Sequence, residues 1–366
     1  SLHVGHIVPL IALARLQRYG HHPIALAGGG TTMIGDPSGK SSERPLLTRE
    51  QIDENAQSIK QQLAHFLDFD SKTNPARLMN NADWLLKLNL IDFLRDIGKH
   101  FSVNYMLAKD SVKTRIDREQ GLSYTEFSYM LMQSYDFLYL HDTYGCKLQT
   151  GGTDQWGNIT AGVELVRRVR GANVFAMAYP LITRADGTKF GKTASGQSVW
   201  LKADRTSPYR FYQFFFNTDD RDAVKYLKIF TFLDQQRVAE LEAAILAHPE
   251  EREAQRVLAR EVTRILHGET ALDKAEQATQ ALFGGEISGL SAAEIADIFS
   301  DVPSSELAKT QLEGGALTIV DLLVESGVAK SKGEARRSLA EGGVYLNNHR
   351  VTEAGQAVGA ADLLEG

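Results

Sequence analysis

Two pairs of basic residues, far apart in the chain, have the types and spacing of groups that bind phosphate. His3 and His6 stand at the start of a predicted helix that runs to about residue 19. A helix N-terminus favours phosphate because it presents unpaired N–H groups and the positive end of the helix dipole. Lys189 and Lys192 lie in a glycine-spaced loop, where lysines can stabilise the charge that develops as pyrophosphate leaves. Either pair alone is more often an ordinary surface feature.

Two glycine-rich segments directly follow β-like runs. Residues 28–41 end like a P-loop, but Ile34 stands where that motif requires glycine, so the P-loop interpretation fails. That segment leaves one acidic residue, Asp36, in a turn. In the second segment, Gly152 allows close backbone approach and Asp154 could accept hydrogen bonds from ribose hydroxyls. Because ligands bind at the carboxyl ends of parallel strands, both segments are candidate sites, although each could also be a plain turn.

A third group lies on a predicted helix over residues 125–140, which is rich in apolar side chains. Tyr129, Gln133 and Asp136 are spaced by four and three residues, so they share one face of this helix. Burying Gln and Asp costs free energy unless each has a polar partner. A polar ligand would supply those partners; protein groups or buried water are the alternative.

Composition limits the class of protein that carries these groups. The chain has 366 residues, 40 basic against 46 acidic, 43% hydrophobic residues and a single cysteine, Cys146. One cysteine excludes a disulfide framework and a cysteine-based zinc site. No membrane-spanning stretch or secretion signal is present, so we expect a cytoplasmic protein. The mild acidity argues against a general nucleic-acid coat protein but permits a local basic patch.

The length of the chain and the changes in residue pattern along it predict more than one domain. Helical patterns alternate with short β-like runs at first, which is typical of an α/β fold with a mostly parallel sheet. A helical stretch follows, then a linker, then a small α+β unit in which Asn347 and Asn348 predict a tight hairpin. The expected ranges are 1–204, 205–300, 301–315 and 316–366.

These elements, in this order, resemble the class I aminoacyl-tRNA synthetases, whose two signatures are matched by residues 3–6 and 189–193. The resemblance is more specific to bacterial-type tyrosyl-tRNA synthetase, because residues 34–39, 129–136 and 151–158 are similar to motifs of that family. It implies a Rossmann-like catalytic domain with a dimer-interface insertion, an α-helical anticodon-side domain and an S4-like RNA-binding domain. We expect the chain to be truncated, without the family's first strand and with an incomplete S4-like domain.

The resemblance also implies a role for each candidate site residue. Tyrosine would be bound at its ammonium by Asp36, Tyr129 and Gln133, at its phenol by Asp136, and near its carboxyl group by Gln155. ATP binding would involve Gly5, Gly152, Asp154 and Lys192. The catalytic groups around the phosphates would be His3, His6, Lys40, Arg44, Lys189, Lys192 and Thr193.

The implied activity is that of a tyrosine-tRNA ligase, which makes tyrosyl adenylate from L-tyrosine and ATP and then charges tRNA(Tyr). ATP would act as a substrate with Mg²⁺, without a protein-bound metal or organic cofactor. RNA contacts are expected at Lys330, Lys332, Arg336 and Arg337. A homodimer is expected through the apolar segment 91–106. Two alternatives stay open: a tryptophan-specific relative, and a non-catalytic RNA-binding protein on the same scaffold.

Overall fold

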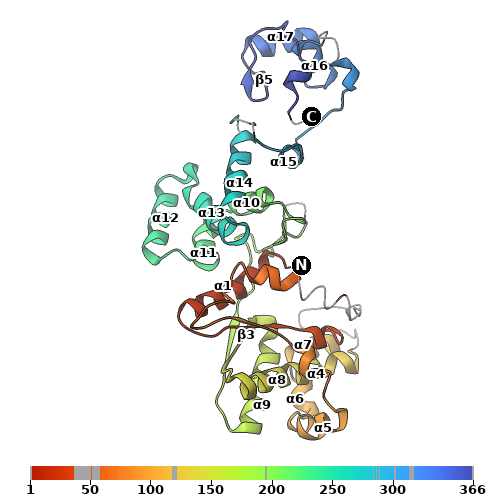
Figure 1. Ribbon diagram of the computed structural model, residues 1–366, viewed down its shortest axis with the longest axis vertical. Coiled ribbons are helices and arrows are strands. Elements are labelled where there is room, and N and C mark those ends of the chain that lie inside the picture. The colour runs from red at the N-terminus through yellow and green to blue at the C-terminus, as the bar shows by residue number, and fades with distance from the viewer. Residues whose placement is uncertain are drawn as a thin grey trace. The chain divides into compact units, whose positions relative to one another are not determined.

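The computed structural model describes most of the chain (Figure 1). The described residues are 2–36, 51, 58–117, 122–193, 196–282, 284–285, 287, 289–300, 302–312 and 317–364. They form two compact units: Ser1–Lys202 together with Asp219–Ala254, and Ala203–Thr218 together with Gln255–Gly366. The helices of residues 219–254 therefore pack within the first unit, and the domain limits given above remain predictions.

The first unit contains two pairs of parallel strands. β1 (Ile24–Ala27) pairs with β2 (Arg77–Asn80), and β3 (Leu148–Gly152) pairs with β4 (Phe175–Tyr179). A helix, α9 (Trp156–Arg170), connects β3 to β4, as parallel pairing requires. The α/β fold predicted from the alternating pattern is confirmed.

The central helix of this unit is α8 (Tyr124–Tyr144), longer at both ends than the predicted 125–140 because it is capped. At its N-terminus, Ser123 accepts a hydrogen bond from a backbone N–H of the first turn; at its C-terminus, Gly145 takes φ 65°, which ends the helix. α8 packs against α9 through the fully buried Phe137. A Cβ on Gly162 would lie 3.2 Å from that ring, so the absence of a side chain there permits the close contact.

The other elements of the first unit are short. They are η1 (Val4–His6), α1 (Ile7–Arg18), α2 (Gly29–Thr32), α4 (Ala82–Leu85), α5 (Leu90–Asp96), η2 (Gly98–His100), α6 (Val103–Leu107), α7 (Asp110–Asp117), η3 (Thr153–Gln155), α11 (Asp220–Phe230), α12 (Gln235–Ala247) and η4 (Pro249–Glu251). Among the described helices, none combines the length and the apolar character needed to span a membrane.

The second unit is mainly helical. It contains α10 (Pro208–Phe216), α13 (Glu253–His267, apart from its first two residues), α14 (Glu269–Leu282), α15 (Ala292–Ile298), η5 (Lys309–Gln311), α16 (Ile319–Glu325), α17 (Lys332–Ala340), β5 (Tyr345–Leu346), β6 (His349–Arg350) and η6 (Ala360–Asp362). The predicted hairpin is confirmed: β5 and β6 pair antiparallel, and Asn347 and Asn348 take φ 50° and 63°.

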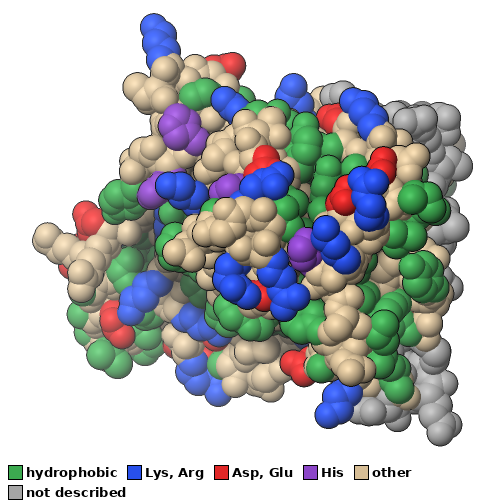
Figure 2. All heavy atoms as spheres, turned by 90° about the horizontal axis from the view of Figure 1, so that it is seen from below, with side chains coloured by type: hydrophobic (Ala, Val, Ile, Leu, Met, Phe, Trp, Pro, Cys, Tyr) green, Lys and Arg blue, Asp and Glu red, His purple; other side chains and the backbone are tan. Residues whose placement is uncertain are grey.

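Basic side chains of the first unit are partly neutralised by acids. Figure 2 shows Lys and Arg side chains gathered on one face, with Asp and Glu side chains among them. The last turn of α9 follows the same pattern, because Arg167 and Arg168 both bond Glu164 and Arg170 bonds Asp142. The two arginines hold the pKa of the Glu164 carboxyl at about 2. Such exposed pairs contribute little to stability because water and salt screen their charges.

Candidate active site

The histidines at the start of the chain are oriented by hydrogen bonds to the backbone. His3 caps η1, and its Nδ1 accepts a hydrogen bond from the Gly5 N–H at 3.1 Å. The Nδ1 of His6 lies 3.1 Å from the His3 backbone nitrogen and 3.2 Å from the His3 carbonyl oxygen, so it accepts or donates according to its tautomer. The two ring centroids lie 4.0 Å apart. Burial lowers the pKa of His6, which favours its neutral ring. The accepting Nδ1 of His3 places the proton of its neutral ring on Nε2, so His3 has an Nε2–H donor.

Residues 198–200 connect this histidine segment to the lysine loop. The Val4 N–H donates to the Val199 carbonyl at 3.0 Å, and the Val199 N–H donates to the Gly191 carbonyl at 3.1 Å. Antiparallel bridges extend the contact on both sides, from His3 to residue 200 and from Lys192 to residue 198. The structure therefore brings together two motifs separated by nearly the whole length of the first unit's sequence.

A second contact joins the two glycine-rich strand ends. The Gln155 Nε2 donates to Asp36 Oδ2 at 2.7 Å, across 119 residues of sequence, and lies 3.4 Å from an oxygen of Asp154. Asp36 follows α2 at the end of β1, and Gln155 lies in η3 at the end of β3. These three predicted site residues are therefore neighbours, and they follow strands of two separately paired parallel sheets. The carboxyl ends of parallel strands are where ligands bind in such folds.

The polar face of α8 meets the same strand. Gln133 Nε2 lies 3.4 Å from the side-chain oxygen of Gln149 in β3. Tyr129, one turn earlier on α8, is half-buried. Gln149 was not among the predicted site residues, although it belongs to a strand that leads into the predicted ribose segment.

Among the predicted site residues that the structure describes, Asp136 is the most deeply buried, with 2% of its surface exposed. One carboxylate oxygen accepts a hydrogen bond from Asn81 Nδ2 at 3.0 Å, and the other accepts one from Trp84 Nε1 at 2.8 Å. Burial raises the pKa of this carboxyl to about 7, and the two hydrogen bonds oppose that rise. A carboxylate in such a site can accept a further hydrogen bond from a ligand hydroxyl.

Asn81 links the Asp136 carboxylate to α2 through hydrogen bonds. Besides Asp136, its Nδ2 lies 3.0 Å from Thr31 Oγ1, and its Oδ1 accepts from the Gly30 N–H at 2.8 Å. Gly30 and Thr31 form part of α2, which leads directly to Asp36. Sequence reasoning missed both Asn81 and Trp84. The signal that could have found Asn81 is its position immediately after β2, the same rule that identified Asp36.

Comparison with known proteins agrees with this arrangement. Residues 1–284 match the family described as tRNA synthetases class I (W and Y), and residues 294–366 match the tyrosine-tRNA ligase SYY-like C-terminal domain. The chain belongs to the class I tRNA synthetases. The chain accordingly contains the Rossmann-like catalytic domain of such a synthetase, with helices, and a C-terminal domain.

The synthetase has close relatives of bacterial origin. It is 58% identical to the tyrosine-tRNA ligase of Roseiflexus castenholzii and 52% identical to that of Geobacillus stearothermophilus, in each case over 100% of this chain and 86% of the relative. It also resembles the crystal structure of a C-terminally truncated mitochondrial tyrosyl-tRNA synthetase from Aspergillus nidulans. There the TM-score is 0.69 at 30% identity, covering 77% of this chain and 82% of the other.

The structure describes some of the remaining predicted site residues of this synthetase and not others. Lys40 and Arg44 lie outside the described residues. Lys189 and Lys192 are exposed, and Thr193 Oγ1 accepts from the Gln197 N–H at 3.1 Å. In the described part of the chain, no group of three or more His, Cys, Asp or Glu residues is placed to hold a metal ion.

Gly5 and Gly152, which are predicted to contact the nucleotide, also leave space for neighbouring side chains. A Cβ on Gly5 would lie 2.8 Å from Cε1 of His3, and a Cβ on Gly152 would lie 2.4 Å from an oxygen of Asp154. Each glycine therefore makes room for a predicted site residue beside it. Substitution of either would displace that neighbour, whatever the nucleotide requires.

The four predicted RNA contacts lie on and just before α17. Lys330, Lys332, Arg336 and Arg337 are all exposed. Lys332 Nζ forms an ion pair with Asp321 at 2.7 Å and holds the pKa of that carboxyl at about 2. Lys332 is thus partly neutralised by the protein itself.

The raised pKa of Asp136 gives stability a defined pH dependence. Its ordinary pKa is 3.8, so between about pH 4 and pH 7 the folded chain holds one more proton here than the unfolded chain. Raising the pH through this window removes stability, by up to about 1.4 kcal/mol per pH unit. We expect denaturant unfolding to show this slope in the wild type and not in Asp136→Asn. A difference between the two proteins that does not change with pH would contradict the prediction.

Proposed function

We propose that this synthetase is a tyrosine-tRNA ligase and that its site residues have the roles predicted above. The observation that carries the proposal is Asp136, a carboxylate buried in the catalytic unit with two fixed donors and capacity for a further one. The relatives that are 52–58% identical are tyrosine-tRNA ligases. A phenol is the ligand group that such a carboxylate would select.

Tyrosine binding follows from the arrangement of the polar groups. The phenolic hydroxyl would donate to Asp136, and this hydrogen bond would lower the pKa of Asp136 by stabilising its charged form. At the other end, the ammonium of tyrosine would be bound by Asp36 with Tyr129 and Gln133. Gln155, which bonds Asp36, would lie near the reacting carboxyl group.

The first step would be attack of the tyrosine carboxylate on the α-phosphorus of ATP. A bond forms between the carboxylate oxygen and the α-phosphorus, and the bond to the leaving pyrophosphate breaks. The imidazole side chains of His3 and His6 would stabilise the α-phosphate, while Lys189, Lys192 and Thr193 would stabilise the pyrophosphate, with Lys40 and Arg44 assisting. Gly5 would meet the adenosine, and Gly152 and Asp154 the ribose.

The second step would transfer the tyrosyl group to the terminal ribose of tRNA(Tyr), releasing AMP. No side chain forms a covalent intermediate in either step. Catalysis would rest on positioning and on charge placed where the transition state needs it. Mg²⁺ would accompany ATP as part of the substrate.

Tyrosine-dependent exchange between ATP and labelled pyrophosphate tests this function. We expect exchange with tyrosine and essentially none with tryptophan or phenylalanine. Exchange driven by tryptophan instead would favour the tryptophan-specific alternative. Binding of tRNA without exchange driven by any amino acid would favour a non-catalytic RNA-binding protein.

The tRNA would be bound in part through the four basic residues on and before α17. Their exposure and charge suit phosphate contacts, which supply affinity rather than sequence choice. We also propose that the protein is located in the cytoplasm, a reducing compartment in which disulfides are rare, and its single cysteine agrees with this.

A homodimer is the proposed assembly. Within the segment predicted for this role, Phe93 and Phe101 pack inward against the core. Ile91 and Val103 instead expose 67% and 61% of their surface, in α5 and α6. A large apolar patch on the surface favours a protein contact, and these two side chains would belong to such a patch. Sedimentation analysis of Ile91→Asp should show a smaller species than the wild type if this face forms the contact.

A further inference from the structure

The lysine loop begins with a small hairpin. Thr183 and Lys189 form an antiparallel bridge, and the Arg184 N–H donates to the Thr188 carbonyl at 2.9 Å. The turn is made by Asp186 and Gly187: the Asp186 carboxylate accepts a hydrogen bond from the backbone N–H of residue 188 at 2.8 Å, and Gly187 takes φ 82°. We call residues 183–189 the lysine hairpin. Lys189 lies at its end, and Lys192 follows shortly after.

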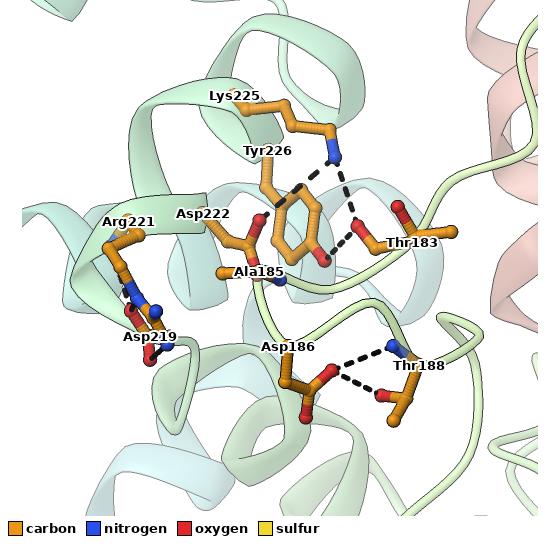
Figure 3. A network of polar contacts seen from close by, with 9 residues as sticks. All are labelled: Thr183, Ala185, Asp186, Thr188, Asp219, Arg221, Asp222, Lys225 and Tyr226. Atoms are coloured by element: carbon orange, nitrogen blue, oxygen red, sulfur yellow. Dashed lines mark hydrogen bonds and ion pairs between the residues drawn. The ribbon is translucent and has the colours of Figure 1, made fainter.

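Helix α11 holds the first strand of the lysine hairpin through three polar contacts (Figure 3). The Asp222 Oδ2 accepts from the Ala185 N–H at 2.7 Å. The Thr183 carbonyl accepts from Lys225 Nζ at 2.9 Å and from the Tyr226 hydroxyl at 3.3 Å. Asp222 is 4% exposed, so its bond to the hairpin is shielded from water.

An aromatic contact holds the other end of the hairpin on the same helix. Phe190, directly after Lys189, packs edge-on against Tyr226 with ring centroids 5.0 Å apart. It also stacks on Phe230 at 5.1 Å. Burial and the nearby charge of Asp222 raise the pKa of Tyr226, so its hydroxyl keeps its proton and remains a donor. One helix therefore fixes both ends of the hairpin beside the lysines.

The Asp222 contact is not needed to start α11. That helix is capped by Asp219, whose carboxylate accepts a hydrogen bond from the backbone N–H of Arg221 at 2.9 Å and also bonds the Arg221 side chain. Asp222, in the same first turn, instead bonds the hairpin. A charge-assisted hydrogen bond to a backbone N–H sets the position of that backbone more closely than apolar packing does.

We propose that Asp222, together with Tyr226, is a positioning residue that fixes the lysine hairpin so that Lys189 and Lys192 reach the leaving pyrophosphate. This inference rests on the proposed function. The two side chains themselves touch no substrate; they act through the backbone at Ala185 and Thr183. Their effect should therefore appear in the chemical step and not in the binding of tyrosine.

The test is the rate of tyrosyl adenylate formation in single turnovers of the 366-residue chain. We expect Asp222→Ala to lower this rate about 10- to 100-fold at saturating tyrosine and ATP, with the tyrosine Kd changed less than about twofold. Asp222→Asn should recover most of the rate, because its amide oxygen can still accept from the Ala185 N–H. Tyr226→Phe, which removes only the hydroxyl, should lower the rate severalfold even if Asp222→Ala does not fold.

Two controls separate positioning from general stability. Asp219→Ala weakens the cap of the same helix, and we expect it to lower the melting temperature while leaving the rate nearly unchanged. In a background that carries both Lys189→Ala and Lys192→Ala, the effect of Asp222→Ala should shrink to less than about threefold, because the two lysines it positions are gone. Equal rate losses in Asp219→Ala and Asp222→Ala, or full additivity of Asp222→Ala with this double substitution, would overturn the proposal.

A readout without catalysis keeps this inference separate from the proposed function. Trypsin should cleave after the exposed Lys189 and Lys192 faster in Asp222→Ala than in the wild type, with unchanged rates at sites outside residues 183–193. Equal cleavage in the two proteins would overturn the inference. If the wild type shows no tyrosine-dependent exchange, the proposed function fails, and the trypsin comparison alone still decides whether Asp222 fixes the hairpin.

Discussion

Replacing Lys192 by alanine is expected to slow the formation of tyrosyl adenylate about 10²- to 10³-fold, the usual cost of removing one donor that stabilises transition-state charge. The affinity for tyrosine should change less than about twofold, since the lysine would meet charge that develops only as pyrophosphate leaves. The structure supports a role in the site because Lys192 bridges to residue 198, beside the segment that bonds Val4. Stopped-flow measurement of adenylate formation checks the prediction.

A matched control is Lys228→Ala. Lys228 is an exposed lysine on α11 in the same unit and has no proposed contact with substrate. Its removal should leave the rate within about twofold. If Lys192→Ala weakened tyrosine binding and left the rate of the chemical step intact, Lys192 would not act on the pyrophosphate.

Replacing Asp136 by asparagine is expected to reduce the preference for tyrosine over phenylalanine by at least about 100-fold. Bound phenylalanine gives the wild-type carboxylate no phenol to accept from, and such an unsatisfied polar site rejects the analogue strongly. Tyrosyl-tRNA synthetases as a family discriminate between the two amino acids by about 10⁵. The variant would lose most of this penalty because leaving a neutral amide without the phenol costs less than leaving a buried charged carboxylate without it. The ratio of kcat/KM values for the two amino acids in pyrophosphate exchange measures the change.

The control on the same helix is Asp142→Asn. Asp142 lies on α8 too, but its carboxylate pairs with Arg170 near the surface. We expect this variant to keep the preference of the wild type. If both substitutions reduced the preference equally, the selectivity would come from the stability of α8 and not from Asp136.

Local signals in the sequence predicted the elements well where they were strong. The two asparagines predicted the hairpin of β5 and β6 because they tolerate positive φ, and both adopt it. The apolar pattern of α8 predicted a buried helix. Asp36, Asp154 and Gln155 were foreseeable as site residues because each follows a β-like run, and ligands bind at the carboxyl ends of parallel strands.

Other features depend on contacts that no local pattern encodes. Residues 198–200 form isolated bridges with segments from both signatures, and a segment of three residues is too short to show a hydrophobic periodicity. The pattern of α11 predicts a buried face, but it does not say that this face meets the lysine hairpin. For the same reason Trp84 gave no sign of its bond to Asp136, since 52 residues separate them and the bond exists only in the folded chain.

The central claim is that one active site contains both the carboxylate that binds the phenol of tyrosine and the groups that bind the phosphates of ATP. A crystal structure of the chain with tyrosine, ATP and Mg²⁺ tests it most directly. We predict density for tyrosyl adenylate, with the phenolic oxygen about 2.7 Å from a carboxylate oxygen of Asp136 and the phosphate within hydrogen-bond distance of Nε2 of His3 or His6. Tyrosine bound elsewhere, with Asp136 contacted only by Asn81 and Trp84, would contradict the account.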